Sequence, residues 1–121
     1  MSYSAKYVAS DKISGTKLGG RVVLAPESSI TYENCSEIEK RIEDAIQQNK
    51  TEIIIDFKRV EFLDSAALEM LLQAHAEFKS NGGTLKIVGL NEVCRDILLT
   101  TRIVNMLFVY EDINEAIVHK P

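Results

Sequence analysis

The stretch Ile53-Ile54-Ile55-Asp56, followed by Phe62-Leu63-Asp64-Ser65-Ala66-Ala67-Leu68, decides the fold of this chain. The first segment is a nearly continuous apolar run, which is typical of a strand buried on both faces. After a short loop, Asp64 and Ser65 open an amphipathic helix, so Ser65 lies where a helix leaves its first backbone N–H groups unpaired. An anion is stabilised at such a position. The position suits a serine that accepts phosphate better than a hydrolase nucleophile, because no partner histidine is evident.

The composition is that of one globular domain spanning residues 1–121. Its net charge of −4 and the lack of a Lys/Arg cluster argue against a nucleic-acid partner. No apolar run approaches the ~20 residues of a membrane span. The start, Met1-Ser2-Tyr3-Ser4-Ala5-Lys6, lacks the apolar stretch of a signal peptide. Cys35 and Cys94 have no CxxC spacing, so we expect reduced thiols and no metal site. These features predict a cytoplasmic protein without membrane insertion.

Strand and helix patterns alternate along the chain. Strands are expected over residues 3–10, 21–25, 52–57, 84–88 and 106–110, and helices from 31 or 32 to 49, over 65–80, after the cap Asn91 and over 112–118. This alternation predicts an α/β sandwich whose sheet of about five strands is mainly parallel, with right-handed crossovers. Because no helix joins the first two strands, we expect a mixed sheet with a short antiparallel edge. The three to four helices would lie mostly on one face.

The simplest interpretation of Ser65 is a helix N-cap, whose hydroxyl accepts a hydrogen bond from an N–H two or three residues further on. Asp64 could itself be the cap. In that case the Ser65 hydroxyl would be free to point outward from the first turn. The sequence leaves both alternatives open.

The segment Asp64-Ser65-Ala66-Ala67-Leu68, coming after Ile55-Asp56-Phe57, resembles the signature of the STAS domain. More narrowly, it is similar to the bacterial anti-sigma-factor antagonists. The resemblance extends from about Gly20 to Val118. It includes the turn Asn81-Gly82-Gly83 and the segment Thr101-Arg102-Ile103-Val104-Asn105.

This resemblance implies a switch controlled by phosphorylation. In that family, the serine after the aspartate is phosphorylated by a partner kinase that is also the anti-sigma factor. The unmodified antagonist binds this kinase and frees the sigma factor, whereas the phosphorylated form lets go. Ser65 and Asp64 are the matching positions here. ATP and Mg²⁺ would belong to the partner, so no cofactor and no catalytic residue are expected in this chain.

Two places depart from the family pattern. The family often has a second serine or threonine and then a glycine after the switch serine, where this chain has Ala66 and Ala67. It also often carries a Gly-x-Leu-Asp motif where Ser28-Ser29-Ile30-Thr31 stands here, so Thr31 replaces an aspartate near the switch serine. The residues expected to contact the partner are Asp64, Ala66, Glu69 and Thr31.

Two other functions fit the same sequence. A free-standing STAS-like domain can be an accessory subunit, for example of an ABC lipid-transport complex, and Ser65 would then be a cap or a constitutive contact. An enzyme with Ser65 as its nucleophile would need a histidine nearby. His75 lies on the apolar stripe of a helix and His119 lies in the terminal tail, so neither has an obvious route to Ser65.

Weaker candidates complete the sequence interpretation. Asp56 and Asp64 suggest a metal pair, but an aspartate that ends a buried strand more often caps a loop. The patch Thr100-Thr101-Arg102 is interpreted as a solvated helix end rather than a phosphate site. Both a monomer and a weak dimer are compatible with the sequence.

Overall fold

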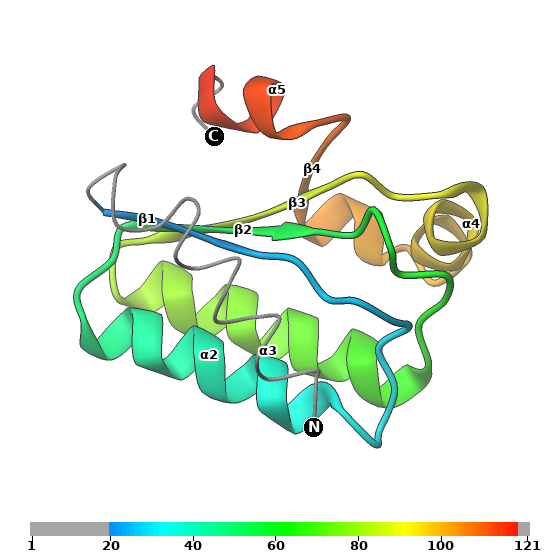
Figure 1. The fold of residues 1–121 in the computed structure, drawn as a ribbon, viewed down its shortest axis with the longest axis horizontal. Helices are drawn as coiled ribbons and strands as arrows, with labels where there is room; N and C mark the ends of the chain where they lie inside the picture. The colour runs from blue at the N-terminus through cyan, green and yellow to red at the C-terminus, as the bar shows by residue number, and fades with distance from the viewer. Residues whose placement is uncertain (1–19, 119–121) are drawn as a thin grey trace.

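Strands and helices alternate along residues 20–118, the part of the chain that the computed structural model describes (Figure 1). The elements are β1 (Arg21–Leu24), α2 (Cys35–Gln47), β2 (Glu52–Asp56), α3 (Ser65–Ser80), β3 (Thr84–Val88), α4 (Glu92–Thr100), the 3-10 helix η2 (Ile103–Met106), β4 (Phe108–Tyr110) and α5 (Ile113–Val118). This order confirms the predicted α/β class. The expected strand over residues 3–10 and His119 lie outside the described residues.

The four described strands form one parallel sheet in the order β1-β2-β3-β4. A helical segment joins each strand to the next, as parallel neighbours require. The sheet therefore has four strands, rather than about five, within residues 20–118. The predicted antiparallel edge would involve the segment outside that range, so it stays a prediction.

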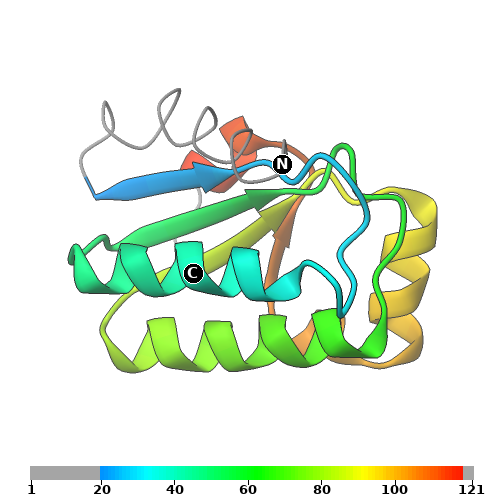
Figure 2. The ribbon, with the colours of Figure 1, turned by 60° about the horizontal axis from the view of Figure 1, so that its bottom comes forward.

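Helices cover both faces of the sheet, but unequally (Figure 2). The helices α2 and α3 lie side by side along one face, α4 stands beside the carboxyl ends of the strands, and the short α5 lies over the other face. Side chains of β2 alternate accordingly: Ile53 and Ile55 belong to the core under α2 and α3, while Ile54 packs with Ala116 of α5. All three isoleucines are fully buried, as expected for a central parallel strand.

The C-terminal end of α3 is set by a local signal. Asn81 caps the helix, and its backbone N–H donates to Glu77 and Phe78. Gly82 follows with a φ of 82°, the left-handed region in which glycine is favoured. A Cβ on Gly83 would lie 2.2 Å from the Phe78 ring, so this position has no room for a side chain. The helix therefore ends where the sequence predicts.

Other boundaries differ from the prediction, mostly by one or two residues, and α2 ends at Gln47 rather than at residue 49. The helix α2 begins at Cys35, rather than at residue 31 or 32, because Thr31 and Asn34 first form a turn. In that turn the Thr31 N–H donates to Asn34 Oδ1 at 2.9 Å. The strand β4 begins two residues later than predicted, because the chain first forms η2.

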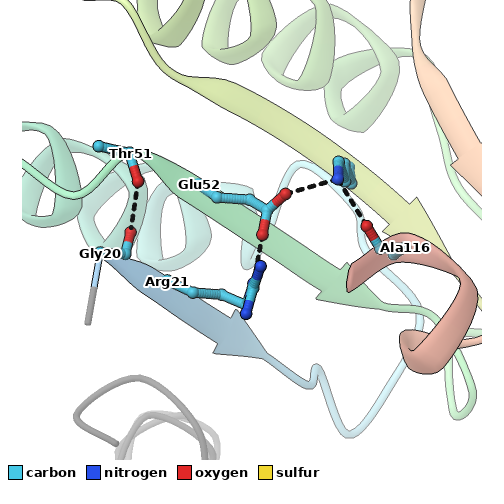
Figure 3. A network of polar contacts seen from close by, with 6 residues as sticks. Gly20, Arg21, Thr51, Glu52 and Ala116 are labelled. Carbon is cyan, nitrogen blue, oxygen red and sulfur yellow. Dashed lines mark hydrogen bonds and ion pairs between the residues drawn. The ribbon is translucent and has the colours of Figure 1, made fainter. Parts of the chain in front are cut away.

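A polar network lies on the sheet face that α5 covers (Figure 3). Glu52 of β2 accepts a hydrogen bond from Arg21 of β1 and forms an ion pair with Lys86 of β3, with Nζ 2.6 Å from Oε2. Lys86 Nζ also donates to the carbonyl oxygen of Ala116 at 2.5 Å and lies 5.4 Å from the centroid of the Tyr110 ring. The network therefore joins α5 to all four described strands, around a lysine that is buried.

Candidate functional site

Asp64, not Ser65, is the N-cap of α3. Its backbone is extended, and its Oδ1 accepts a hydrogen bond from the Ala67 N–H at 2.9 Å. Ser65 is the first residue of the helix and is exposed. Within residues 20–118 the Ser65 hydroxyl has no hydrogen-bond partner. Of the two alternatives that the sequence left open, the structure thus selects the one in which Asp64 caps the helix and the serine is accessible.

The other carboxylate oxygen of Asp64 holds a second loop in place. Its Oδ2 accepts a hydrogen bond from the Tyr32 N–H at 2.8 Å. Asp64 N donates to the carbonyl oxygen of Ile30 at 3.3 Å, and Ile30 N donates to the carbonyl oxygen of Phe62 at 3.2 Å. Leu63 pairs with Ile30 as a short parallel bridge, and both side chains are buried. The loop after β1 and the loop before α3 therefore form one connected unit.

This connection brings together the residues that the sequence nominated. Thr31 follows Ile30 and lies next to the Asp64 backbone, while Glu69 lies one turn of helix beyond Ser65 on the same face. Ser65 and Glu69 are exposed, whereas the other three residues are partly buried. We call this set the Ser65 surface: Thr31, Asp64, Ser65, Ala66 and Glu69.

Thr31 stabilises the loop that carries it. Its Oγ1 accepts a hydrogen bond from the Glu33 N–H at 3.2 Å, so the hydroxyl stabilises its own loop. Ser29 has a similar role, because its Oγ accepts from the Phe62 N–H at 3.1 Å. Beside these residues a polar hollow of about 430 Å³ opens between the two loops. Arg59 lines it and pairs with Glu27 at 2.7 Å.

Two residues of this region were missed by the sequence interpretation. Tyr32 and Phe62 have exposed fractions of 73% and 46%. A large apolar residue in a loop gives no periodic signal, so its exposure could not be read from the sequence. The one available hint was their place in the sequence. Tyr32 directly follows Thr31, and Phe62 lies two residues before Asp64.

The cysteines are poor candidates for chemistry at neutral pH. Burial raises the pKa of the Cys94 thiol to about 11, and its Sγ lies 3.5 Å from the carbonyl oxygen of Val60. Burial, followed by the charges of Asp64 and Glu39, also raises the pKa of Cys35. Both thiols are free and stay protonated near neutral pH.

His75 does not complete a catalytic group with Ser65. It lies ten residues further along α3, a helical rise of about 15 Å. Its ring meets the Phe108 ring edge-on, with centroids 5.8 Å apart, and its Nδ1 is buried without a hydrogen-bond partner. Burial, followed by the charge of Lys79, lowers the pKa of His75. The histidine therefore belongs to the packing between α3 and β4.

The remaining candidates have structural roles. Asp56 Oδ1 accepts a hydrogen bond from the Lys58 N–H at 3.0 Å, which confirms its predicted role in capping a loop. Thr101 Oγ1 donates to the carbonyl oxygen of Ile97 at 2.7 Å and so closes the end of α4. Residues 20–118 contain no group of three or more His, Cys, Asp or Glu side chains arranged to hold a metal ion. In the same part of the chain, no helix is both long and apolar enough to span a membrane.

Comparison with known families and structures gives one consistent result. The family model of the STAS domain matches residues 9–116. A Thermotoga maritima protein described as a candidate anti-sigma factor antagonist superposes with a TM-score of 0.77 at 25% identity, covering 83% of this chain and 86% of its own. The anti-sigma factor antagonist SpoIIAA in its unphosphorylated form gives 0.63 at 19% identity, covering 82% and 86%.

The same fold also occurs inside a much larger protein. The murine anion transporter Solute Carrier 26 family member A9 superposes with a TM-score of 0.70 at 14% identity, covering 84% of this chain but 18% of the transporter. A likeness at this identity shows a shared fold alone. A comparison with curated protein sequences finds no significant match.

Proposed function

The chain belongs to the STAS domain family, and from this premise we propose that it is an anti-sigma-factor antagonist whose binding to a protein partner is controlled by phosphorylation of Ser65. The partner would be an anti-sigma factor with serine kinase activity, and the protein would act in the cytoplasm without being an enzyme itself. The observation that carries the proposal is that Asp64 caps α3 and leaves the Ser65 hydroxyl exposed. Asp64 already makes the N-capping hydrogen bond, so the Ser65 hydroxyl is not needed for it.

The position of Ser65 also suits a phosphate. The first turn of a helix presents unpaired N–H groups and the positive end of the helix dipole, so an anion there is compatible with the fold. A phosphoserine adds about −1.5 to −2 charges. On a surface that a partner must cover, such a charge costs several kcal/mol, and ~3 kcal/mol already changes affinity about a hundredfold. A single modification could therefore switch binding without refolding the domain.

The first experiment compares two immobilised variants, Ser65→Ala and Ser65→Asp, as baits in a lysate of the source organism. Mass spectrometry identifies what each bait retains. We expect an ATP-binding kinase-like protein on Ser65→Ala that is lost on Ser65→Asp. A third bait, Ser80→Asp, places the same charge at the other end of α3 and should retain the partner.

A second experiment tests the modification itself. The retained protein is purified and incubated with the wild-type chain, ATP and Mg²⁺, and phosphopeptides are mapped. Phosphate on Ser65, and none after Ser65→Ala, is the expected result. Retention of the same protein by all three baits, with no phosphorylation, would remove the switch and leave Ser65 as an ordinary helix residue.

A second candidate function has one observation in its favour. The fold recurs as a part of the murine anion transporter named above. If this chain were an accessory domain of a transport complex, both Ser65 baits would retain transport subunits equally. The same pair of baits therefore separates the two functions.

A further inference from the structure

Tyr32 and Phe62 are the two aromatic side chains that are largely exposed within residues 20–118, and both adjoin the Ser65 surface. Asp64 Oδ2 holds the backbone of Tyr32 through its N–H. The backbone of Phe62 is held at both groups, because its N–H donates to Ser29 Oγ and its carbonyl oxygen accepts from Ile30 N. An exposed aromatic ring on a fixed backbone loses little conformational freedom on binding, which favours it as an interface anchor.

The charges around these rings identify the kind of surface that would cover them. The segments 27–34 and 57–69 together carry five carboxylates and two cations; the carboxylates belong to Glu27, Glu33, Glu61, Asp64 and Glu69, and the cations to Lys58 and Arg59. Arg59 already pairs with Glu27. A partner with an acidic contact surface would be repelled even by the unmodified protein.

We propose that Tyr32 and Phe62 are the apolar anchors of the partner-binding surface, and that the partner covers Ser65 with an apolar patch surrounded by cationic side chains. This inference rests on the proposed function of Ser65 and adds how the partner is recognised. The partner is a protein, since two rings flanked by carboxylates fit neither a nucleic-acid backbone nor an anionic lipid surface.

The proposal changes the physical explanation of the switch. The acidic character of the Ser65 region argues against repulsion by a partner's carboxylates as the basis of the switch. Instead, a phosphate on Ser65 would be buried under the apolar patch of the partner, away from the cationic side chains at its edge. Burying a charge without a paired counter-charge is strongly unfavourable. The switch would then respond to the presence of a charge at residue 65, whatever its sign.

The first part of the test measures the anchors. The partner retained by the Ser65→Ala bait is purified, and its dissociation constant is measured by isothermal titration calorimetry. Tyr32→Ala and Phe62→Ala should each weaken binding by about tenfold or more. Leu99→Ala on α4 and Val118→Ala on α5 are the controls, because they remove exposed side chains (54% and 73%) in other parts of the domain. Each should change the dissociation constant by less than about twofold.

The second part compares three side chains at position 65. Ser65→Asp and Ser65→Lys should both weaken binding by about tenfold or more, while the uncharged Ser65→Gln is affected much less. If Ser65→Lys instead binds as well as wild type or tighter, the partner surface over Ser65 is acidic and the proposal is overturned. If Ser65→Asp binds as well as wild type, the phosphorylation switch itself fails.

The two proposals therefore fail in different ways. If Ser65→Asp abolishes partner binding while Tyr32→Ala and Phe62→Ala leave it unchanged, the switch stands and the proposed anchors are overturned. If both alanine variants weaken partner binding while a charge at residue 65 leaves it unchanged, the anchors stand and the switch is overturned. If no bait retains a protein, both proposals are overturned.

Discussion

Lys86 and Glu52 form an ion pair across the sheet, with Nζ 2.6 Å from Oε2, beneath the last turn of α5. The two partners are not equivalent. Glu52 keeps a second cationic neighbour, Arg21, when Lys86 is lost, whereas the Lys86 side chain is 2% exposed and its charge has almost no access to water. Removing one member of a buried pair is costly mainly because the other is left uncompensated. The loss of Glu52 should therefore be worse than the loss of Lys86.

The prediction is a difference between two variants in urea unfolding. Glu52→Gln should lower the free energy of unfolding by about 3 kcal/mol, because it removes the carboxylate that lies against the buried Lys86 charge. Lys86→Met, which keeps Glu52 paired with Arg21, should lower it by about 1–2 kcal/mol. The double variant should be more stable than Glu52→Gln alone. A larger loss for Lys86→Met would contradict the assigned asymmetry.

Asp64 is expected to stabilise the domain as well as to flank Ser65. Asp64→Ala removes both the cap of α3 and the bond to the Tyr32 N–H, and should lower the free energy of unfolding by about 2–3 kcal/mol. Asp64→Asn keeps one oxygen for the cap and should lose less. Glu69→Ala, an exposed control on the same helix, should stay within about 0.5 kcal/mol of wild type. Equal losses for Asp64→Ala and Glu69→Ala would mean that the bridge between the loops contributes nothing.

How far the fold follows from the sequence depends on the range of the interactions involved. The bounds of α3 are predicted correctly because an aspartate cap and a glycine stop act within a few residues. The predicted start of α2 is wrong because the loop before this helix takes its shape from the segment before α3, about thirty residues away. The shift of β4 has the same origin, since η2 packs against α3 and α4.

In the candidate site, too, the local contacts could be predicted from the sequence and the contacts between distant segments could not. Ser65, Asp64 and Glu69 are neighbours through helical spacing alone, and the sequence predicts their proximity. Tyr32 joins them only through a hydrogen bond between loops, and Lys86 meets Glu52 only through the strand register. A sequence pattern shows neither kind of contact, because both require the pairing of segments that are distant along the chain.

His75 should make the protein less stable in mild acid. Its folded pKa lies below its ordinary value of 6.5, mainly through burial and then through the charge of Lys79. The unfolded chain therefore takes up a proton more readily, so the contribution of His75 is fully present above about pH 6.5 and is lost as pH falls toward the folded pKa. His75→Gln does not titrate, and its urea midpoint should fall less than that of wild type between about pH 7.5 and 5.5. Parallel falls in the two proteins would contradict the buried position of Nδ1.

A serine-reactive fluorophosphonate should not label Ser65. The serine has no hydrogen bond to a base within residues 20–118, and His75 lies too far along α3 to act as one. Labelling is followed by intact-mass spectrometry, with a known serine hydrolase as the positive control. Stoichiometric labelling that is lost in Ser65→Ala would establish a nucleophile and contradict the proposal that this chain is not an enzyme.

Ser65→Asp should fold normally even where it abolishes partner binding. A carboxylate in the first turn of α3 meets the positive end of the helix dipole, a gain of about 0.3–1 kcal/mol that offsets its repulsion by Asp64. The free energy of unfolding should therefore stay within about 1 kcal/mol of wild type. Ser80→Asp is the matched control, because it places the same charge at the negative end of the helix and removes the hydrogen bond from Ser80 Oγ to the Glu77 carbonyl oxygen. It should be the less stable of the two in urea. If Ser65→Asp were the less stable variant, the serine would be packed inside the domain rather than exposed at the start of α3, and a phosphate there would act by unfolding the protein.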